Sequence, residues 1–370
     1  MQRQASIKFK LSWTDVQVLF VVQCMRVRGA RAKRVILVCF RQTNEQGVAV
    51  RTIQVASVQF EHRDNDSDYN LSRIEALTQQ ATDRGAEIVS FHEGCISGYS
   101  WIQPLDKQQL LAAAEPVPDG PSVKRLCEIA ARFNTHIMAG LFERDADDNV
   151  YNSYVTVGPG GFVTKFHKLH PFVNPHLKPG AGYRVIELLG CKIGFLICYD
   201  NNLPENVRLT TMLGAEIIFM PHVTGCLPSV MPGRGSVDPQ LWENREQDPV
   251  SLRQEFRGPK GRDWLMRWLP TRAFENGVYT VFSNPIGKDY NTIKPGLAMI
   301  IDPYGEIIVE SHALGDDVVI ATLTPDKLET ASGRRYIKAR RPELYDQMVE
   351  PQESVTAPGW KMEHGRQEGS

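Results

Sequence analysis

The pattern of apolar and polar positions becomes regular near residue 53. Thr52–Phe60 alternates with a period of two, which predicts a half-buried β-strand. In Asp68–Arg84, apolar side chains recur every three or four residues from Leu71 to Ala81, which predicts an amphipathic helix. Strand and helix patterns then alternate along the chain. This order predicts a layered α/β fold with sheets inside and helices outside.

The same criteria place the remaining elements. Further helices are expected at Gly120–Phe133 and Trp264–Asn276, and further strands at Glu87–Phe91, His136–Phe142, Val150–Val157, Phe162–Phe166, Ile193–Ile197, Glu216–Met220, Val278–Asn284, Leu297–Ile301, Ile307–Glu310 and Val318–Leu323. Gly158–Gly161 and Asp302–Gly305 are turn sequences that predict hairpins. Gly225–Asp263 is long, highly charged and rich in Pro and Gly, which predicts an insertion loop without a packed core.

Composition excludes several classes of partner. The chain has 370 residues, 42% of them hydrophobic, and a net charge of −1, so nothing indicates nucleic acid or an anionic membrane as a partner. Its seven cysteines include no C-x-x-C pair, which favours reduced thiols and a cytoplasmic location over a disulfide framework. No apolar run is long enough to span a membrane.

Residues 1–50 differ in charge from the rest of the chain. They carry nine Lys or Arg and two acidic residues, a net charge of +7. An organelle-targeting peptide, a poorly ordered extension or upstream start codon, and an arm that packs on another subunit all fit this composition. We therefore predict three segments: a basic, poorly ordered extension (1–50), a folded domain (51–348) containing the insertion loop, and a polar tail (349–370).

The candidate chemistry centres on Gly190–Asn206. An apolar strand there is followed by Cys198, a polar turn and a helix start at about Pro204. A strand–turn–helix junction holds a nucleophile above the end of a sheet and directs the next backbone N–H groups toward it, as acyl-transfer enzymes require. Taken alone, this stretch favours the simpler interpretation of Cys198 as an ordinary buried cysteine.

Two further reactive side chains follow apolar strands in the same way. Glu93 comes after Glu87–Phe91, and Lys168 comes after Phe162–Phe166. Because the ends of sheet strands converge, we expect both to meet Cys198. A carboxylate can remove the thiol proton, and an ammonium can stabilise the oxyanion that forms next. Each residue alone is also compatible with an ordinary surface charge.

Five sequence motifs give a family resemblance across Ile53–Tyr345. HEGCISGY, FHKLHP and GFLICYDNNLPE resemble the glutamate, lysine and cysteine motifs of the nitrilase, or carbon–nitrogen hydrolase, superfamily; RAFENGVYTVFSNPIG and GLAMIIDPYGEIIVE match further along. The resemblance implies an α-β-β-α sandwich that pairs into a four-layer dimer. It also implies that Glu93 is the base, Lys168 the oxyanion stabiliser and Cys198 the nucleophile, with the backbone N–H of Tyr199 completing the oxyanion hole.

The sequence departs from the family near Lys168. Members usually carry a second glutamate that orients the lysine, whereas this chain has no acid between Lys168 and Glu187. Asn174 or His176 occupies that neighbourhood and is expected to hydrogen-bond the ammonium, and both are predicted to belong to the substrate-binding and oxyanion site. His222, in FMPHVTG, is expected to face the pocket or to be an ordinary loop histidine. Asp200 and Glu205 are weighed as ligands for a substrate amine, although a helix dipole explains Glu205 more simply.

The resulting prediction is a cofactor-free hydrolase of a small amide that acts through a cysteine thioester, with no metal site. His167, His170 and His176 lack the spacing of a zinc-binding helix. A nitrilase, an N-carbamoyl-amine hydrolase and an inactive binding or scaffold member of the family are the alternatives. The Tyr-Asp pair after Cys198 favours the amidase branches by resemblance, because nitrilases typically have Trp-Glu there. We expect a homodimer or larger homo-oligomer.

Overall fold

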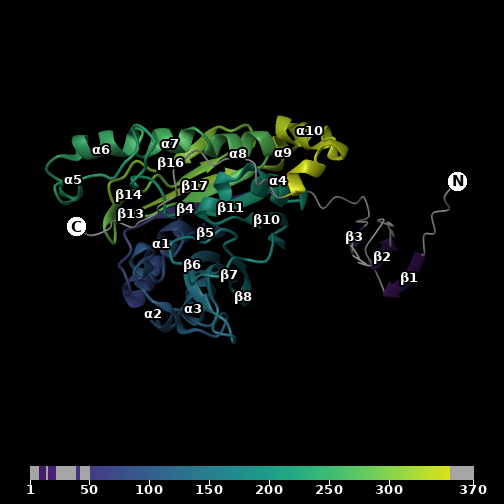
Figure 1. The fold of residues 1–370 in the computed structure, drawn as a ribbon, viewed down its shortest axis with the longest axis horizontal. Coiled ribbons are helices and arrows are strands. Elements are labelled where there is room, and N and C mark those ends of the chain that lie inside the picture. Colours follow the sequence, from purple (N-terminus) through teal and green to yellow (C-terminus); the bar gives the residue numbers. More distant parts are fainter. Residues whose placement is uncertain (1–7, 14–15, 22–38, 42–50, 351–370) are drawn as a thin grey trace. The chain divides into compact units, whose positions relative to one another are not determined.

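The computed structural model describes residues 8–13, 16–21, 39–41 and 51–350 (Figure 1). The chain divides into two units, residues 1–49 and 50–370. In the first, β1 (Lys8–Trp13), β2 (Val16–Val21) and β3 (Cys39–Arg41) form a three-stranded antiparallel sheet. The prediction of a poorly ordered extension falls largely outside the described residues, as does the predicted tail.

The second unit is built on two six-stranded sheets. The first sheet has the order β17 (Asp317–Leu323), β4 (Ile53–Gln59), β5 (Ile88–Ser90), β6 (His136–Arg144), β7 (Val150–Gly158) and β8 (Gly161–His167). The second has the order β16 (Ile307–Glu310), β15 (Met299–Ile301), β12 (Tyr279–Ser283), β11 (Ile217–Pro221), β10 (Cys191–Phe195) and β9 (Val185–Leu188). The chain runs parallel in β4–β5–β6 and in β10–β11–β12, where helices connect the strands.

The two sheets pack face to face around a shared apolar core. Val55 and Met138 of the first sheet and Phe195 and Phe219 of the second belong to one buried cluster. Near the centre the contact is also polar, because the Ser57 hydroxyl donates to the Phe282 carbonyl at 2.6 Å. The sheets are therefore tied by packing and by buried, satisfied hydrogen bonds.

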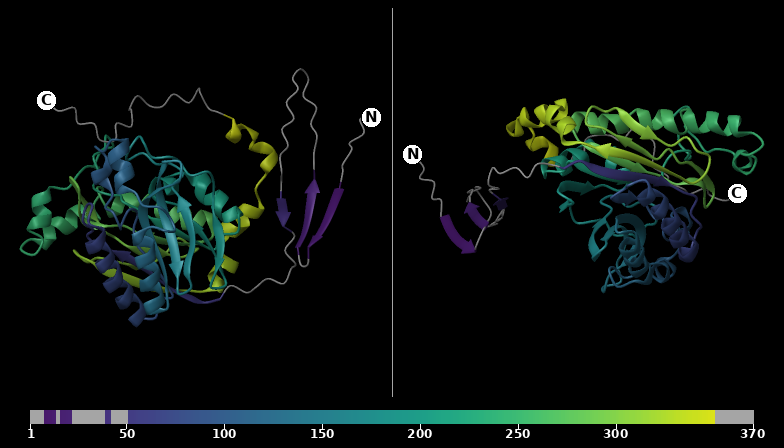
Figure 2. Two further views of the ribbon diagram at one scale, coloured as in Figure 1. Left: turned by 90° about the horizontal axis from the view of Figure 1, so that it is seen from below. Right: turned by 180° about the vertical axis from the view of Figure 1, so that it is seen from behind.

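Helices cover the outer faces of both sheets (Figures 1 and 2). On the first sheet, α1 (Ser67–Asp83) and α3 (Pro121–Phe133) bury one apolar side each. On the second, α4 (Pro204–Met212) and α8 (Leu269–Asn276) do the same. The order helix, sheet, sheet, helix confirms the predicted α-β-β-α sandwich. Among the described residues, no helix has both the length and the apolar content needed to cross a membrane.

The insertion loop was predicted wrongly. Residues 225–263 contain α5 (Pro239–Glu243), α6 (Pro249–Arg257) and the start of α7 (Arg262–Met266). Trp242, Leu252 and Phe256 are buried there in an apolar cluster with Ile286 and Ile293. The high charge and the many Pro and Gly residues therefore do not exclude a small core, because these three large side chains are enough to anchor short helices.

Other differences are local. The helix predicted at Trp264–Asn276 is divided into α7 and α8, because Pro270 lies in the first turn of α8 and cannot continue a preceding helix. The elements that were not predicted include α2 (Lys107–Ala113), β9, and the hairpin of β13 (Ile286–Asp289) and β14 (Thr292–Pro295). The remaining described elements are η1 (Ser100–Ile102), η2 (Cys198–Asn202), α9 (Pro325–Thr330), α10 (Ser332–Lys338), η3 (Pro342–Leu344) and η4 (Asp346–Val349).

Candidate active site

The three predicted catalytic side chains lie at the ends of strands from both sheets. Glu93 follows β5 and Lys168 follows β8, both in the first sheet, whereas Cys198 follows β10 in the second. All three side chains are buried. Lys168 Nζ donates to Glu93 Oε1 at 2.6 Å, and the charges of both residues influence the Cys198 thiol. The candidate site therefore depends on the docking of the two sheets.

A tight turn presents Cys198. Its φ of +50° lies in the left-handed region, which a residue with a side chain seldom adopts unless its surroundings hold it there. Asn201 provides that support, because its amide nitrogen donates to the Leu196 carbonyl at 2.9 Å and to the Cys198 carbonyl at 3.2 Å. The Cys198 Sγ lies 3.9 Å from the Val223 carbonyl oxygen. The predicted strand–turn–helix junction is present, with η2 as the turn and α4 as the helix.

The environment keeps the Cys198 thiol protonated. Burial and the nearby negative charge of Glu93 raise the pKa of the thiol to about 12, and the positive charge of Lys168 opposes this shift in part. At neutral pH the thiolate is therefore scarce, and nucleophilic attack needs a base. Glu93 Oε2 has no hydrogen-bond partner in the described part of the chain, so this oxygen is free to accept a proton.

The carboxylate and the ammonium form a buried pair with additional support. Asn152, on β7, donates from its amide nitrogen to Glu93 Oε1 at 2.7 Å. The hydroxyl of Tyr99 lies 3.3 Å from Lys168 Nζ. Burial is the largest single effect and disfavours the lysine charge, but Glu93, Tyr99, Cys198 and Asp200 together outweigh it and raise the pKa of Lys168 well above its ordinary value. Lys168 therefore stays a cation, as a group that stabilises an oxyanion must.

Asp200 joins the lysine segment to the cysteine turn. This buried carboxylate accepts from the backbone N–H groups of Leu169 and His170 at 3.1 and 2.9 Å. It also accepts from the N–H of Ile197 at 3.2 Å and contacts the His170 ring nitrogen at 3.0 Å. Its oxygens are thus used within the protein, which corrects the suggestion that Asp200 binds a substrate amine.

His222 contacts the cysteine turn through Asn201. It is fully buried, and burial together with the charge of Lys168 holds its pKa well below the ordinary value, so the ring is neutral. The amide nitrogen of Asn201 lies 3.1 Å from His222 Nε2; because an amide nitrogen can only donate, Nε2 is the acceptor. Direct contact of His222 with substrate stays a prediction.

Asn174 and His176 do not take the place of the missing glutamate. The Asn174 amide nitrogen donates to the carbonyls of Ile102 and Leu105 at 2.8 and 2.9 Å, and its oxygen accepts the His176 N–H. His176 itself is exposed. The prediction that either residue hydrogen-bonds Lys168 is therefore wrong. Asn174 instead connects its own loop to the segment that contains Ile102 and Leu105.

Aromatic rings occupy the space near the ammonium. Lys168 Nζ lies 4.9 Å from the centre of the Phe172 ring and 5.5 Å from that of Tyr99. Tyr199 lies beside this group, with its ring centre 5.6 Å from that of Phe172. The lysine is thus surrounded by one carboxylate, one phenol and aromatic faces.

The histidines considered for a metal are dispersed. His167 Nε2 pairs with Glu143 at 2.8 Å, and His170 Nδ1 pairs with Asp200 at 3.0 Å. Each ring therefore has its own carboxylate partner, and exposed His176 belongs to neither pair.

Sequence reasoning missed Asn152 and Tyr99. Tyr99 is the last residue of the motif HEGCISGY, and Asn152 is a buried polar residue in a mostly buried strand. A buried asparagine in such a strand must find hydrogen-bond partners. This requirement is the only signal in the sequence that Asn152 has a polar partner, and it does not identify that partner as Glu93.

The pKa of Cys198 gives a direct prediction for its alkylation. Because the pKa is raised to about 12, less than about 1% of Cys198 is thiolate at pH 10. The pH profile of alkylation by iodoacetamide, followed at Cys198 by peptide mass spectrometry, should therefore show no inflection near pH 8.5. N-acetylcysteine provides the control with an ordinary pKa. A profile with a midpoint near 8.5 and a plateau before pH 10 would contradict this electrostatic description.

Comparison with known proteins identifies the family. A sequence model described as "Carbon-nitrogen hydrolase" matches residues 54–332. This chain belongs to the carbon–nitrogen hydrolase family. It is accordingly a hydrolase that acts on carbon–nitrogen bonds other than peptide bonds, and the resemblance to the nitrilase superfamily is confirmed.

Relatives of this carbon–nitrogen hydrolase carry several activity names. "Hydrolase in pqqF 5'region" of Pseudomonas protegens is 31% identical over 305 residues, which is 81% of this chain and 93% of that protein. "Nitrilase" of Pyrococcus abyssi is 28% identical and covers 73% of this chain and 89% of its own. "(R)-stereoselective amidase" of Pseudomonas sp. is 28% identical and covers 80% and 95%.

Solved structures show the same fold. Saccharomyces cerevisiae Nit3, a member of branch 10 of the nitrilase superfamily, superposes with a TM-score of 0.61 at 22% identity, covering 80% of this hydrolase and 98% of Nit3. A mutant of the amidase from Nesterenkonia sp. AN1 superposes with a TM-score of 0.59 at 20% identity, covering 82% and 98%. That structure shows covalent addition of the acetamide moiety of fluoroacetamide at its active site cysteine.

Proposed function

We propose that this hydrolase cleaves a small amide through a thioester on Cys198. The observation that carries the proposal is the buried group of Glu93, Lys168 and Cys198, in which the thiol is protonated and one carboxylate oxygen is unoccupied. Glu93 takes the thiol proton as Sγ bonds to the amide carbonyl carbon. The carbonyl oxygen becomes an oxyanion, which Lys168 stabilises.

The second half of the reaction uses the same groups in reverse. The tetrahedral intermediate collapses, its C–N bond breaks, and Glu93 gives its proton to the departing ammonia or amine. Glu93 then removes a proton from water, and the resulting hydroxide adds to the thioester carbon. Collapse of this second intermediate releases the carboxylic acid and returns the proton to the Cys198 sulfur. Atoms and protons balance with water as the only co-substrate.

The backbone N–H of Tyr199 is proposed as the second oxyanion donor. Tyr199 is the second residue of η2. The first N–H groups of a helix have no acceptor within that helix, so this donor is not committed to the turn. It lies directly after the nucleophile in the chain, which is where acyl-transfer enzymes place such a donor.

The names of relatives support an amide or carbamoyl-amine substrate. Besides the amidase, they include "Citrullinase" of Francisella tularensis and "N-carbamoylputrescine amidase" of Solanum lycopersicum, each 28% identical and covering 80% of this chain. The covalent acetamide adduct of the Nesterenkonia amidase supports Cys198 as the nucleophile. The relative named "Nitrilase" keeps nitrile hydrolysis as the second candidate.

Amide and nitrile substrates can be separated by one comparison. An amide gives an oxyanion, for which the site has cationic and N–H donors, whereas a nitrile gives a thioimidate nitrogen that must be protonated. We expect kcat/KM for a primary amide or carbamoyl-amine to exceed that for the matched nitrile at least tenfold, about 1.4 kcal/mol in barrier. Ammonia release from one acyl group presented in both forms measures the ratio. A higher value for the nitrile would assign the chain to the other branch.

Two further parts of the proposal concern its assembly and location. Leu209, Met212 and Leu213 at α4 and Phe274 on α8 are large apolar side chains exposed on the outer face of the second sheet's helices. Such a face supports the predicted homodimer, in which a second copy would cover it. Cytoplasmic location likewise stays a prediction.

A further inference from the structure

Asp289, at the end of β13, is a fully buried carboxylate that holds a segment far away in the sequence. Its Oδ1 accepts the backbone N–H of Ser100 at 2.9 Å, and its Oδ2 accepts the Ser100 hydroxyl at 2.6 Å. Ser100 is the first residue of η1, and the first N–H groups of a helix have no acceptor within that helix. Asp289 therefore supplies, from another part of the fold, the acceptor that fixes the start of η1.

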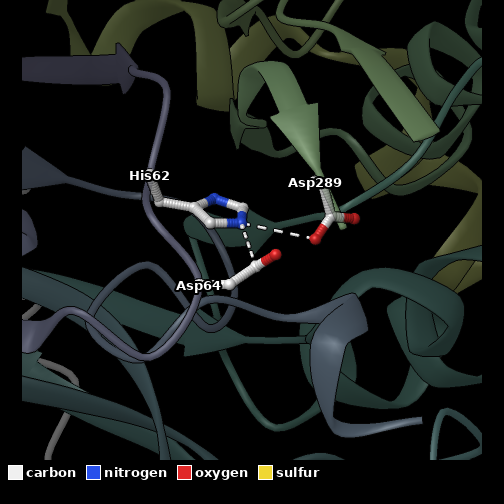
Figure 3. A group of neighbouring side chains, drawn as sticks. All are labelled: His62, Asp64 and Asp289. Carbon is white, nitrogen blue, oxygen red and sulfur yellow. Dashed lines mark hydrogen bonds and ion pairs between the residues drawn. The ribbon is translucent and has the colours of Figure 1, made fainter. Parts of the chain in front are cut away.

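The surroundings keep Asp289 ionised although it is buried. Burial raises the pKa of its carboxyl group, but the hydrogen bond with His62, the charge of Lys294 and the Ser100 hydroxyl hold that pKa well below its ordinary value. Figure 3 shows the His62 ring directed at this carboxylate, with Nε2 3.3 Å from Oδ1. Hydrogen bonds to an ionised acceptor are about twice as strong as neutral ones, so the contacts with Ser100 are firm.

The same neighbourhood resembles a cation site, because donor atoms of His62, Asp64 and Asp289 lie within 4.8 Å of one another. However, both oxygens of Asp289 already accept hydrogen bonds from Ser100. The buried ammonium of Lys294 also lies 3.6 Å from Oδ2, and it would repel a metal ion bound to the same carboxylate. The carboxylate is thus committed to contacts within the protein.

The insertion supports the hairpin that carries this carboxylate. Ile286 on β13 and Ile293 on β14 pack in one apolar cluster with Trp242 of the insertion. The indole N–H of Trp242 donates to Glu61 Oε1 at 3.1 Å, and the backbone N–H of Lys288, on β13, donates to the same oxygen at 2.9 Å. The hairpin is therefore fixed by an apolar core and by hydrogen bonds.

The segment held by the hairpin reaches the lysine of the candidate site. Tyr99, directly before Ser100, is buried, and Lys168 Nζ donates to its hydroxyl at 3.3 Å. At the other end of η1, the Asn174 amide nitrogen donates to the Ile102 carbonyl at 2.8 Å. Thus η1 is fixed at its start by the hairpin and at its end by the loop that follows Lys168.

The Tyr99 hydroxyl restricts the direction of the lysine ammonium. Burial and the nearby charge of Glu93 raise the pKa of Tyr99 well above its ordinary value, so the phenol stays neutral. A lysine ammonium has three N–H donors on a flexible stem. In Lys168 one donates to Glu93 and one to Tyr99, and Nζ makes no other hydrogen bond in the described part of the chain. The third donor remains for the oxyanion.

We propose that Asp289 is a positioning residue: by anchoring Ser100 it holds the Tyr99 hydroxyl against Lys168, and so directs the third N–H of the ammonium at the oxyanion. This inference rests on the proposed function, in which Lys168 stabilises that oxyanion. The segment after Lys168 lacks the acid that usually orients the lysine in this family, and the anchored phenol orients it instead. Because the oxyanion forms only during the reaction, the positioning acts on the transition state more than on substrate binding.

Asp289→Asn tests the anchor at its source. The variant keeps the shape of the side chain but has one acceptor oxygen in place of two, so one hydrogen bond from Ser100 is lost. We expect kcat for amide hydrolysis to fall at least about tenfold with KM within about twofold of wild type, because stabilisation of the transition state alone is reduced. The control is Asp64→Asn, which removes the other acid beside His62 and should keep wild-type kcat. Unchanged kcat in Asp289→Asn would overturn the inference.

A double-mutant cycle separates positioning from a general loss of structure. Tyr99→Phe removes the hydroxyl, and its kcat should fall by about as much as that of Asp289→Asn. If Asp289 acts through this hydroxyl, the protein with both substitutions should lose no more than about twofold in kcat beyond Tyr99→Phe alone. Losses that multiply would show that Asp289 acts in another way. Should Asp289→Asn not fold, Ser100→Ala takes its place in the cycle, with the same expected result.

Amide hydrogen exchange tests the anchor without a substrate. Peptides that contain η1 should exchange faster in Asp289→Asn than in wild type, whereas Asp64→Asn should match wild type. If wild type hydrolyses no amide but this pattern holds, the proposed function fails and the anchoring of η1 stands. If amides are hydrolysed but Asp289→Asn keeps wild-type kcat, the positioning role fails alone. Unaltered exchange of η1 in Asp289→Asn would overturn the anchoring itself.

Discussion

Replacing Cys198 by Ala should lower the kcat for ammonia release by about a thousandfold or more. The substitution removes the atom that forms the thioester, and the base and the oxyanion donors cannot act without it. Glu93→Gln should be nearly as severe, because burial, the larger cause of the raised thiol pKa, persists in the variant and no base remains to take the thiol proton. Single-turnover and steady-state assays with the best amide from the amide and nitrile comparison measure both losses.

The matched control is Cys127→Ala. Cys127 is a free, half-buried cysteine on α3, away from the strand ends that carry the candidate site. It should keep wild-type kcat, and circular dichroism should show that both cysteine variants retain their secondary structure. A Cys198→Ala protein with more than about a tenth of wild-type activity, a loss below roughly 1.4 kcal/mol, would exclude the thioester mechanism.

Asp200→Asn should damage stability and activity together. The buried carboxylate accepts hydrogen bonds next to both Lys168 and Cys198, through the N–H groups of Leu169 and Ile197. An amide offers one acceptor oxygen and turns its NH₂ group toward backbone donors. We expect a loss of about 2–4 kcal/mol in the free energy of unfolding, measured by urea denaturation. We expect kcat/KM to fall more than tenfold as the lysine and cysteine segments shift apart.

Glu205→Gln is the control for removing a nearby acid. Glu205 is exposed in the first turn of α4, where a carboxylate contributes through the helix dipole alone, typically below 1 kcal/mol. Its stability and activity should stay close to wild type. An Asp200→Asn protein indistinguishable from Glu205→Gln in both measurements would show that Asp200 does not hold the two segments together.

The positions of the candidate catalytic residues could be predicted because each follows a strand with a clear local pattern. An apolar run ends directly before Cys198, and others end one residue short of Glu93 and Lys168, so local sequence and motif place all three. Their partners could not be predicted in the same way. The contact between Asn152 and Glu93 joins residues 59 positions apart, and only tertiary structure shows it.

Composition misled where a few large side chains dominate. The insertion has the charge and the Pro and Gly content of a loop, yet Trp242 and Phe256 are enough to give it a core. Lys294 was overlooked for the converse reason. One lysine in a charged chain carries no signal of burial, yet Lys294 is fully buried beside Asp289, with which it forms an ion pair. The placement of such a group depends on how the hairpin packs, which local pattern does not encode.

The pairing of β17 with β4 sets a condition on synthesis. β17 (Asp317–Leu323) pairs along the whole length of β4 (Ile53–Gln59). The pairing of β4 on this side is therefore complete only after β17 has been synthesised. A nascent chain on the ribosome that has not yet reached residue 317 keeps one side of β4 as an open edge, which readily pairs with other chains. More than 250 residues separate the two strands. A stalled or shortened chain would therefore expose the edge of β4 and need chaperones to prevent its aggregation.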